Sequence, residues 1–457
     1  MTKRHGYALL AAMIAVVMIT AAAIYFGVVS DNGSKDPFAG NRAPHNPAAP
    51  ASAGTWVGAW SASPAGAEPG TVRNGLAGRS LRNIIHAGTS GTSARVTLSN
   101  LYGHQPLTIT HASVAVAAAP NSATAAVDTL RPLTFGGSAS VRIPAGQQVV
   151  SDAAAIVIPY GSDVLVTTYS PTPSGPVTYH PRAQQMSYAA VGDRTQDPDG
   201  AAYTEQTPYW RYVTALDVLS NETDGTVVAI GDSLTDGANS TVGANRRWPD
   251  VLTARLRDAD SGGPRYTVVN QGISGNRVLS GGGIVAVPAQ RGATGAATGG
   301  GLRIAQNPSG LSRFGRDVLG RSNVKAVVIA MGVNDILRTP HQTDPRKITD
   351  GLRVLVRQAH ARGLRVIGAT LMPFGGHRGY TDQLEAVRQA VNAEIRGGRV
   401  FDAVVDFDKA LQDPYSPRRL RAEYDSGDHL HPSDRGYERM ADAFRLKDFR
   451  GAAPARL

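Results

Sequence analysis

Five residues in the second half of this chain are of the types that together attack a carbonyl carbon. Ser233 offers a hydroxyl nucleophile and His431 a base, and Asp428 offers a carboxylate to orient that base. Gly275 and Asn334 offer a backbone N–H and a side-chain N–H for the oxyanion that such an attack creates. Each residue type is common, but each of these five follows an expected strand or lies in a loop. Their order therefore points to nucleophilic acyl chemistry.

Ser233 lies in a tight Gly-Asp-Ser turn that directly follows an apolar strand expected at 227–230. The turn should lead into a helix, whose free N-terminal N–H groups can stabilise a developing oxyanion. The turn is not a Gly-x-Ser-x-Gly elbow, which argues against the ordinary α/β-hydrolase fold. It also lacks the Gly-Lys-Ser/Thr of a phosphate-binding loop. The alternative is an ordinary turn with a helix-capping residue and no chemistry.

Asp428 and His431 are three residues apart in a Gly-Asp-His-Leu-His-Pro segment before a helix expected at 433–444. On one helical turn this spacing places both side chains on the same side. A carboxylate there fixes the imidazole tautomer and stabilises imidazolium. His429 allows another interpretation, since Asp-His-x-His could hold a metal ion, although no third ligand is evident elsewhere. His431 is preferred as the base because Asp428 reaches it at this spacing.

Gly275 and Asn334 follow strands expected at 266–269 and 324–330. Both could serve as turn residues only. Neighbouring parallel strands end at the same edge of a sheet, however, and the ligand crevice lies there. An Asn amide and a Gly N–H at these positions would point into the crevice that also receives Ser233.

From residue 226 onward, continuous apolar strands alternate with helical patterns. Strands are expected at 227–230, 266–269, 324–330, 364–368 and 400–405, and helices at 249–258, 345–362, 381–395 and 433–444. This alternation predicts an α/β fold, with a parallel sheet covered by helices on both faces.

Residues 54–222 show short β-branched strands separated by Gly, Pro, Ser and Asn. The expected strands are 81–86, 94–99, 107–116, 155–159 and 163–168. The pattern is typical of an antiparallel β-sandwich. It could bind carbohydrate or position a substrate, or it could be a packing domain without a ligand. Its histidines show no ligand spacing and are expected to be structural or surface residues; they are His86, His104, His111 and His180.

Residues 1–30 have the pattern of a targeting segment, with basic residues before an uncharged stretch. The apolar core at 9–29 is long enough to span a bilayer, whereas the apolar part of a cleaved signal sequence is shorter. An uncleaved membrane anchor is therefore favoured over a signal sequence, although an Ala-Ala-Ala run at 21–23 could host cleavage. The basic flank predicts that the rest of the chain lies outside the cell. Residues 31–53, rich in Pro, Ala, Gly and Asn, are expected to form a flexible linker.

Composition sets further bounds. A chain of 457 residues predicts two folded domains, at 54–222 and 223–450. There is no cysteine, which excludes disulfides, a thiol nucleophile and cysteine-zinc sites. The formal net charge is +10, but no tight Lys/Arg run with interleaved aromatics occurs, so a nucleic-acid partner is not expected.

The second half resembles the SGNH hydrolase superfamily, also called the GDSL esterase/lipase family. Four sequence blocks carry the resemblance, in family order: Gly231-Asp232-Ser233-Leu234, Gly272-Ile273-Ser274-Gly275-Asn276, Gly332-Val333-Asn334-Asp335 and Asp428-His429-Leu430-His431-Pro432. The resemblance covers about residues 224–446 and implies a three-layer α/β/α, flavodoxin-like domain. The preceding β region is similar to the N-terminal region of longer secreted bacterial members. A glycine-rich insertion at 281–301 lies beside the second block.

The resemblance also implies a role for each residue. Ser233 would be the nucleophile, with Asp428 and His431 completing a triad. The N–H groups of Ser233 and Gly275 and the amide of Asn334 would form the oxyanion hole. No cofactor or metal is implied.

Together these observations predict an exported serine esterase that acts on acyl or acetyl esters of lipid or carbohydrate, as small molecules or polymers. One alternative is an acyltransferase that uses the same residues with an alcohol acceptor. Another is a binding protein with an idle triad. A membrane partner is expected only through residues 1–30, if they are not cleaved. Because all five residues follow residue 224, the chemistry is expected to reside in that half alone.

Overall fold

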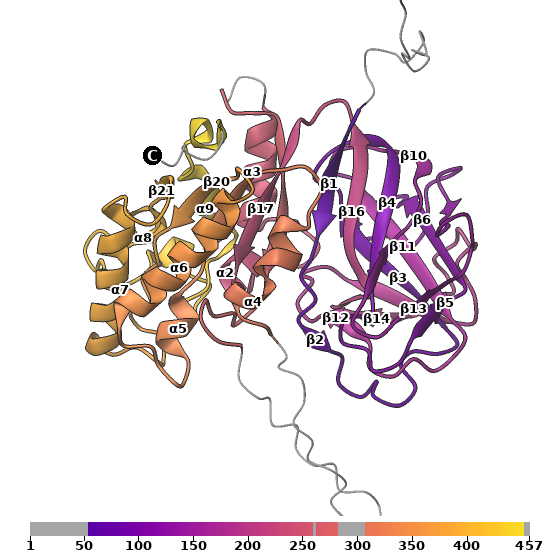
Figure 1. Cartoon of the computed structure of the whole chain (residues 1–457), viewed down its shortest axis with the longest axis horizontal. Helices are drawn as coiled ribbons and strands as arrows, with labels where there is room; N and C mark the ends of the chain where they lie inside the picture. Colours follow the sequence, from indigo (N-terminus) through magenta and orange to yellow (C-terminus); the bar gives the residue numbers. More distant parts are fainter. Residues whose placement is uncertain (1–53, 259–261, 282–306, 452–457) are drawn as a thin grey trace, which may run out of the picture. The chain divides into compact units, whose positions relative to one another are not determined.

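The structure is a computed structural model that describes residues 54–258, 262–281 and 307–451. The predicted targeting segment (1–30) and linker (31–53) lie outside these residues, as does nearly all of the insertion at 281–301. Among the residues that are described, no helix is both long and apolar enough to cross a bilayer. The described residues from Gly54 onward form one compact unit, in which a β half precedes an α/β half (Figure 1).

The β half consists of sixteen strands. They are β1 (Thr55–Ser61), β2 (Gly66–Ala67), β3 (Arg79–His86), β4 (Gly91–Ser99), β5 (Leu107–Ile109), β6 (His111–Val116), β7 (Arg131–Pro132), β8 (Val141–Ile143), β9 (Gln148–Val150), β10 (Ala154–Ile158), β11 (Asp163–Ser170), β12 (Thr178–His180), β13 (Ser187–Val191), β14 (Glu205–Thr207), β15 (Trp210–Arg211) and β16 (Val213–Ser220). All of their pairings are antiparallel.

Two larger sheets face one core. One has the order β1-β16-β4-β10, with β9 also paired to β4, and the other has the order β14-β13-β3-β11-β6-β7. Side chains alternate along each strand, so each sheet turns one apolar row inward. Val96 and Leu98 of the first sheet and Val114, Val164 and Val166 of the second are all fully buried in the same cluster. The predicted sandwich is therefore present, and small sheets β15-β12-β2 and β5-β8 flank it.

One expected strand of the β half was wrong in its extent. The segment 107–116 is two strands, because β5 pairs with β8 whereas β6 pairs with β11. The break is at Thr110, where the chain passes from one sheet to another. A β-branched run shows no such change of partner.

The described part of the α/β half has five parallel strands, which are connected by helices of different lengths. The strands are β17 (Gly225–Gly231), β18 (Tyr266–Gly272), β19 (Val324–Ala330), β20 (Arg365–Ala369) and β21 (Ala403–Val405). The α-helices are α2 (Ser233–Asp236), α3 (Trp248–Arg257), α4 (Gly310–Phe314), α5 (Val333–Leu337), α6 (Pro345–His360), α7 (Asp382–Arg396), α8 (Phe407–Leu411) and α9 (Asp434–Asp442). A π-helix spans Gly315–Leu319, and short 3-10 helices span Ala422–Tyr424 and Leu446–Phe449.

The sheet has the order β18-β17-β19-β20-β21, which is the flavodoxin-like order. The chain moves one way from β17 to β18 and the other way from β19 to β21. Right-handed crossovers in opposite directions place their helices on opposite faces. Accordingly, α3 packs beside α9, whereas α6 packs with α4 and α7. The strand order reverses beside β17, so Ser233 follows the strand at which such folds open their ligand crevice.

Two expectations for this half differ from the structure. The strand expected at 400–405 is only Ala403–Val405, because the Asp402 carboxylate accepts the Val366 N–H (2.8 Å) and contacts His360 (3.0 Å). The helices α4, α5 and α8 were not expected, since five residues are too few to show a helical period.

The two halves pack through the first strand of the chain. β1 lies against β18 and β17, and the Gly58 N–H donates to Thr226 Oγ1 (3.0 Å). A Cβ at Gly58 would lie 3.0 Å from Val269 Cγ1, so a larger residue would require Val269 to shift. The contact brings the segment after β1 to the carboxyl end of β18.

Candidate active site

The turn after β17 presents Ser233 at the start of α2. Asp232 precedes the helix, and its Oδ1 accepts the Leu234 N–H (3.0 Å). Gly231 has no room for a side chain, since a Cβ there would lie 1.9 Å from Thr235 Oγ1. Burial raises the pKa of Asp232 to about 7. Ser233 is 7% exposed, so its hydroxyl lies at the floor of the site, with the open N-terminus of α2 beside it.

Asp428, His431 and Ser233 form one continuous chain of hydrogen bonds. His431 Nε2 lies 2.8 Å from Ser233 Oγ, and His431 Nδ1 lies 2.6 Å from Asp428 Oδ2. Asp428 Oδ1 accepts the backbone N–H groups of His431 (2.8 Å) and Leu430 (3.0 Å). Burial opposes the charge on Asp428, but its hydrogen bonds to His431 and Leu430 lower its pKa to about 2. An ionised carboxylate favours a proton on Nδ1 and leaves Nε2 free to accept one from Ser233.

A loop, and not the helical turn assumed from the spacing, sets this geometry. Residues 426–431 adopt no helix, and an isolated bridge joins Asp425 to Pro432. His429 has a φ of 62°, so the chain reverses locally between the two histidines. His429 Nδ1 lies 2.6 Å from Asp425 Oδ2, and each histidine therefore has a carboxylate of its own. The described part of the chain contains no group of three or more residues placed to hold a metal ion.

The second and third blocks reach the same edge of the sheet as Ser233. Gly231 at the end of β17 is in register with Gly272 of β18 and Ala330 of β19, so the three following loops leave together. Gly275 has a φ of 77°, which glycine adopts at low cost. Asn334 is 6% exposed, and its side chain lies beside the Asp232 carboxyl, where it opposes the rise that burial causes in the pKa of that group. A buried amide N–H at this place can donate to an oxyanion.

Arg338 is a site residue that the sequence did not reveal. Its Nε donates to Asn334 Oδ1 (3.1 Å), which turns Nδ2 of the same amide away. A Cβ on Gly275 would lie 2.4 Å from Arg338 Nη2, so the guanidinium covers the Cα of Gly275. Arg338 thus touches both predicted oxyanion donors outside the nucleophile turn. Its place four residues after Asn334 is the signal that could have pointed to it.

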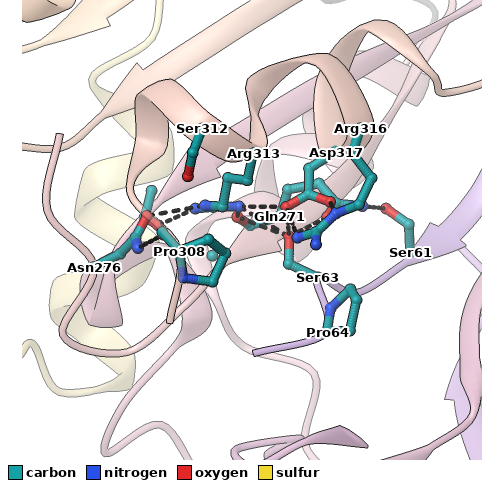
Figure 2. Close-up of polar contacts among 12 residues, drawn as sticks. Ser61, Ser63, Pro64, Gln271, Asn276, Pro308, Ser312, Arg313, Arg316 and Asp317 are labelled. Atoms are coloured by element: carbon teal, nitrogen blue, oxygen red, sulfur yellow. Dashed lines mark hydrogen bonds and ion pairs between the residues drawn. The ribbon is translucent and has the colours of Figure 1, made fainter. Parts of the chain in front are cut away.

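A fully buried arginine ties the ends of the two strands that precede Ser233 and Gly275. Figure 2 shows the Arg313 guanidinium surrounded by acceptors from both halves of the chain. It donates over 2.7–3.0 Å to Gly231 O, Gln271 O, Asn276 Oδ1, Ser63 Oγ and Asp317 Oδ2. Burial opposes the charge of Asp317, yet Arg316 and Arg313 lower its pKa to about 2. Loss of the guanidinium would remove five buried hydrogen bonds, which is costly.

An open groove lies next to the triad loop. It has a volume of about 600 Å³, and a Cβ at Gly376, one of its lining residues, would lie 3.1 Å from His429 Cγ. Its lining is polar and basic and consists of Gly375, Gly376, His377, Tyr380, Asp382, Ser416, Pro417, Arg418 and Arg419. Arg418 is held by Asp382 (2.7 Å). The groove therefore borders the triad loop at His429.

The solved structures that match about half of this chain include three proteins of low sequence identity. One is a carbohydrate acetylesterase from Sinorhizobium meliloti, which is 17% identical over 49% of this chain and 97% of its own, with a TM-score of 0.34. Another is a catalytic mutant of an acetylxylan esterase from Geobacillus stearothermophilus, at 20% identity over 50% and 94%, with a TM-score of 0.35. The third is an alpha/beta hydrolase from the metagenome of Lake Arreo, Spain, at 21% identity over 50% and 98%, with a TM-score of 0.36.

No curated protein gives a significant match to this chain. Residues 229–439 match the GDSL-like lipase/acylhydrolase family, and this stretch includes the five predicted site residues. The matched stretch lies within the α/β half, and the β half lies outside it.

Proposed function

The α/β half of the chain is a GDSL-like lipase/acylhydrolase domain of the SGNH superfamily, and from this premise we propose that the protein is a serine esterase. It would hydrolyse carboxylic esters through an acyl-enzyme on Ser233. The observation that carries the proposal is the hydrogen-bonded chain from Asp428 through His431 to Ser233. The buried Asn334 amide beside the nucleophile turn supports it.

Each residue has a defined task in the proposed reaction. His431 Nε2 accepts the Ser233 proton as Oγ attacks the ester carbonyl, and the resulting imidazolium is stabilised by Asp428. The oxyanion is held by the Ser233 and Gly275 N–H groups and by Asn334 Nδ2. His431 then protonates the leaving alcohol, and water releases the acyl group by the same steps.

The substrate is proposed to be an acyl or acetyl ester of a carbohydrate or lipid. The polar and basic lining of the groove beside the triad loop supports a hydroxylated alcohol on that side. An acyltransferase would use the same residues with an alcohol in place of water. A binding protein with an idle triad would hydrolyse nothing.

Comparison of the unchanged protein with Ser233→Ala tests the proposal. The purified protein would be assayed on aryl esters, acetylated polysaccharides and lysophospholipids, with and without an added alcohol acceptor. We expect hydrolysis by the unchanged protein and none by Ser233→Ala with the same circular dichroism spectrum. Equal turnover by the folded Ser233→Ala protein would refute the proposal, and acyl transfer that exceeds hydrolysis would favour the acyltransferase.

We also propose that the enzyme acts outside the cell. The support is the pattern of residues 1–30, with a basic flank before a long apolar stretch. Fractionation of cells that express the full chain would place the activity in the medium or in the membrane fraction. Activity confined to the cytoplasm would contradict export.

A further inference from the structure

A histidine of the β half is buried against the helix that carries the nucleophile. His180, at the end of β12, is 3% exposed. Its Nδ1 lies 2.8 Å from Ser63 O, and its Nε2 lies 2.9 Å from Asp236 Oδ1 and 3.1 Å from Arg182 O. All three neighbours are acceptors. A neutral imidazole would turn a lone pair toward one of them, so the surroundings require a proton on both nitrogens.

The pairing with Asp236 stabilises the positive charge of the buried His180 imidazolium. Burial disfavours the imidazolium, but Asp236 raises the pKa of His180 above its usual value. The ring and the carboxylate form an ion pair whose side chains are 3% and 4% exposed. Both hydrogen-bonding sides of the ring are satisfied, so the pair is fully hydrogen-bonded as well as charged.

Asp236 carries the contact into the loop of the second block. Its Oδ2 accepts the Ser274 N–H (2.9 Å) and the Ser274 Oγ–H (2.6 Å). Asp236 is the last residue of α2, the helix that begins with Ser233. A Cβ at Gly272 would lie 2.3 Å from the Asp236 N, so α2 and the end of β18 are in close backbone contact. Asp236 therefore links the nucleophile helix directly to the residue before Gly275.

The orientation of the Ser274–Gly275 peptide decides where the Gly275 N–H, a predicted oxyanion donor, points. The Ser274 carbonyl and the Gly275 N–H belong to the same planar unit and point in opposite directions. Asn307 Nδ2 donates to Ser274 O (3.0 Å), while Asp236 holds the N–H and hydroxyl of Ser274. No described residue accepts a hydrogen bond from the Gly275 N–H. Fixing Ser274 therefore fixes where the Gly275 N–H points.

We propose that His180 is a positioning residue for the esterase reaction. It orients and neutralises Asp236, which anchors Ser274 and so aims the Gly275 N–H at the oxyanion. This inference rests on the proposed function. In this proposal the β half raises kcat indirectly, because His180 acts through Asp236 and Ser274 and does not contact the substrate.

The experiment compares His180→Gln and Ser274→Ala, singly and together, in the full chain. His86→Gln is the matched control, since His86 is also in the β half, pairs with a carboxylate (Asp163, 3.0 Å) and has no hydrogen bond to the site. Turnover of an aryl acetate would be expressed per active site, counted with a phosphonate that labels Ser233. This correction removes any loss that is due only to unfolded protein.

We expect each single variant to lose about 10-fold in kcat with KM nearly unchanged, because a misplaced donor weakens binding of the transition state alone. The double variant should lose little more than one single variant, since both act through the same chain. His86→Gln should keep the kcat of the unchanged protein. Heat stability would be followed in parallel by circular dichroism.

Three results would overturn the inference. They are an unchanged kcat per active site in His180→Gln, an unchanged value in Ser274→Ala, and losses that add fully in the double variant. If His180→Gln does not fold, Ser274→Ala alone decides, because Ser274 is only partly buried. A full chain that hydrolyses no ester would instead remove the proposed function itself.

Discussion

Two Asp–His pairs lie within one loop of the α/β half, and their internal geometry is the same. Nδ1 lies 2.6 Å from the carboxylate both in Asp428–His431 and in Asp425–His429. Among the described residues, His431 Nε2 has a partner, Ser233 Oγ at 2.8 Å, whereas His429 Nε2 has none. The side chain of His431 is 18% exposed, whereas that of His429 is 46% exposed. An oriented imidazole is therefore not sufficient for chemistry, and the contact with a nucleophile distinguishes the two pairs.

The backbone separates the pairs. The φ of 62° at His429 directs its side chain away from the direction taken by His431. The ring of His429 then lies close to Gly376, where a Cβ would come within 3.1 Å of it. His429 thus borders the groove, while His431 faces Ser233. The comparison predicts that equivalent substitutions in the two pairs will have very different effects.

The largest difference is expected between His431→Gln and His429→Gln. If His431 is the base, its loss should lower kcat by about 10⁴–10⁶, the effect seen in serine hydrolases. The same change at His429 should lower kcat less than about 10-fold, since this residue reaches no reacting atom. Steady-state assays of both variants on an aryl acetate measure the effects. Comparable losses in the two variants would show that His429 shares the chemistry.

The sequence was sufficient for the strands that carry the candidate site. Parallel strands are buried on both faces, so β17, β18 and β19 appear as continuous apolar runs whose ends can be located. Ser233, Gly275 and Asn334 follow those ends directly. The structure brings these residues to one edge with Asp428 and His431, and their catalytic roles stay predictions.

What the sequence could not reveal depends on contacts between distant segments. His180 was expected to be a structural or surface residue, and no spacing rule links it to Asp236 across the two halves. Arg313 gathers acceptors from both halves, which is equally invisible in a single sequence. The helical turn assumed for Asp428 and His431 gave the correct pairing for a wrong reason. A positive φ at His429, a non-glycine residue, is not encoded by a local pattern.

Substitution of Asp428 should lower kcat more than substitution of Asp425, as is expected for His431 and His429. Asp428→Asn is expected to lower kcat by about 10³–10⁴, because an amide no longer favours the Nδ1–H tautomer. Asp425→Asn should leave kcat within about 10-fold of the unchanged protein. Assays at fixed pH compare the two variants, and circular dichroism checks their folding. A large loss in both would indicate that the loop, and not the tautomer, is at fault.

Asp428 should also affect how the free energy of unfolding depends on pH. Its pKa is lowered to about 2 in the folded protein, below the ordinary value of 3.8. A lowered carboxyl pKa stabilises the folded state above the ordinary value, and the effect is lost as the pH falls from there through about 2. Asp428→Asn should therefore flatten the acid limb of the unfolding curve in that window. An identical acid limb would contradict the ionised pair.

The Asn334 amide is a further predicted part of the site that contains the Asp428–His431 pair and not the Asp425–His429 pair. Asn334→Ala should lower kcat by about 10²–10³, the usual effect of losing one oxyanion donor. KM should change little, since the hydrogen bond strengthens in the transition state. Asn323→Ala is the control, because that exposed amide donates only to Asp224 O (2.9 Å). A change confined to KM would make Asn334 a substrate-binding residue.

The smallest effect is expected on removal of metal ions. This experiment also tests whether the two Asp–His pairs act separately. A metal ion held by Asp-His-x-His would join the two pairs into one site. The structure argues against this, because each carboxylate is already bound to Nδ1 of its own histidine and His431 Nε2 faces Ser233. Dialysis against a strong chelator should therefore leave kcat and KM unchanged, and divalent ions should not raise them. Loss of activity that one divalent ion restores, together with a large loss in His429→Gln, would require a single metal site in place of two separate pairs.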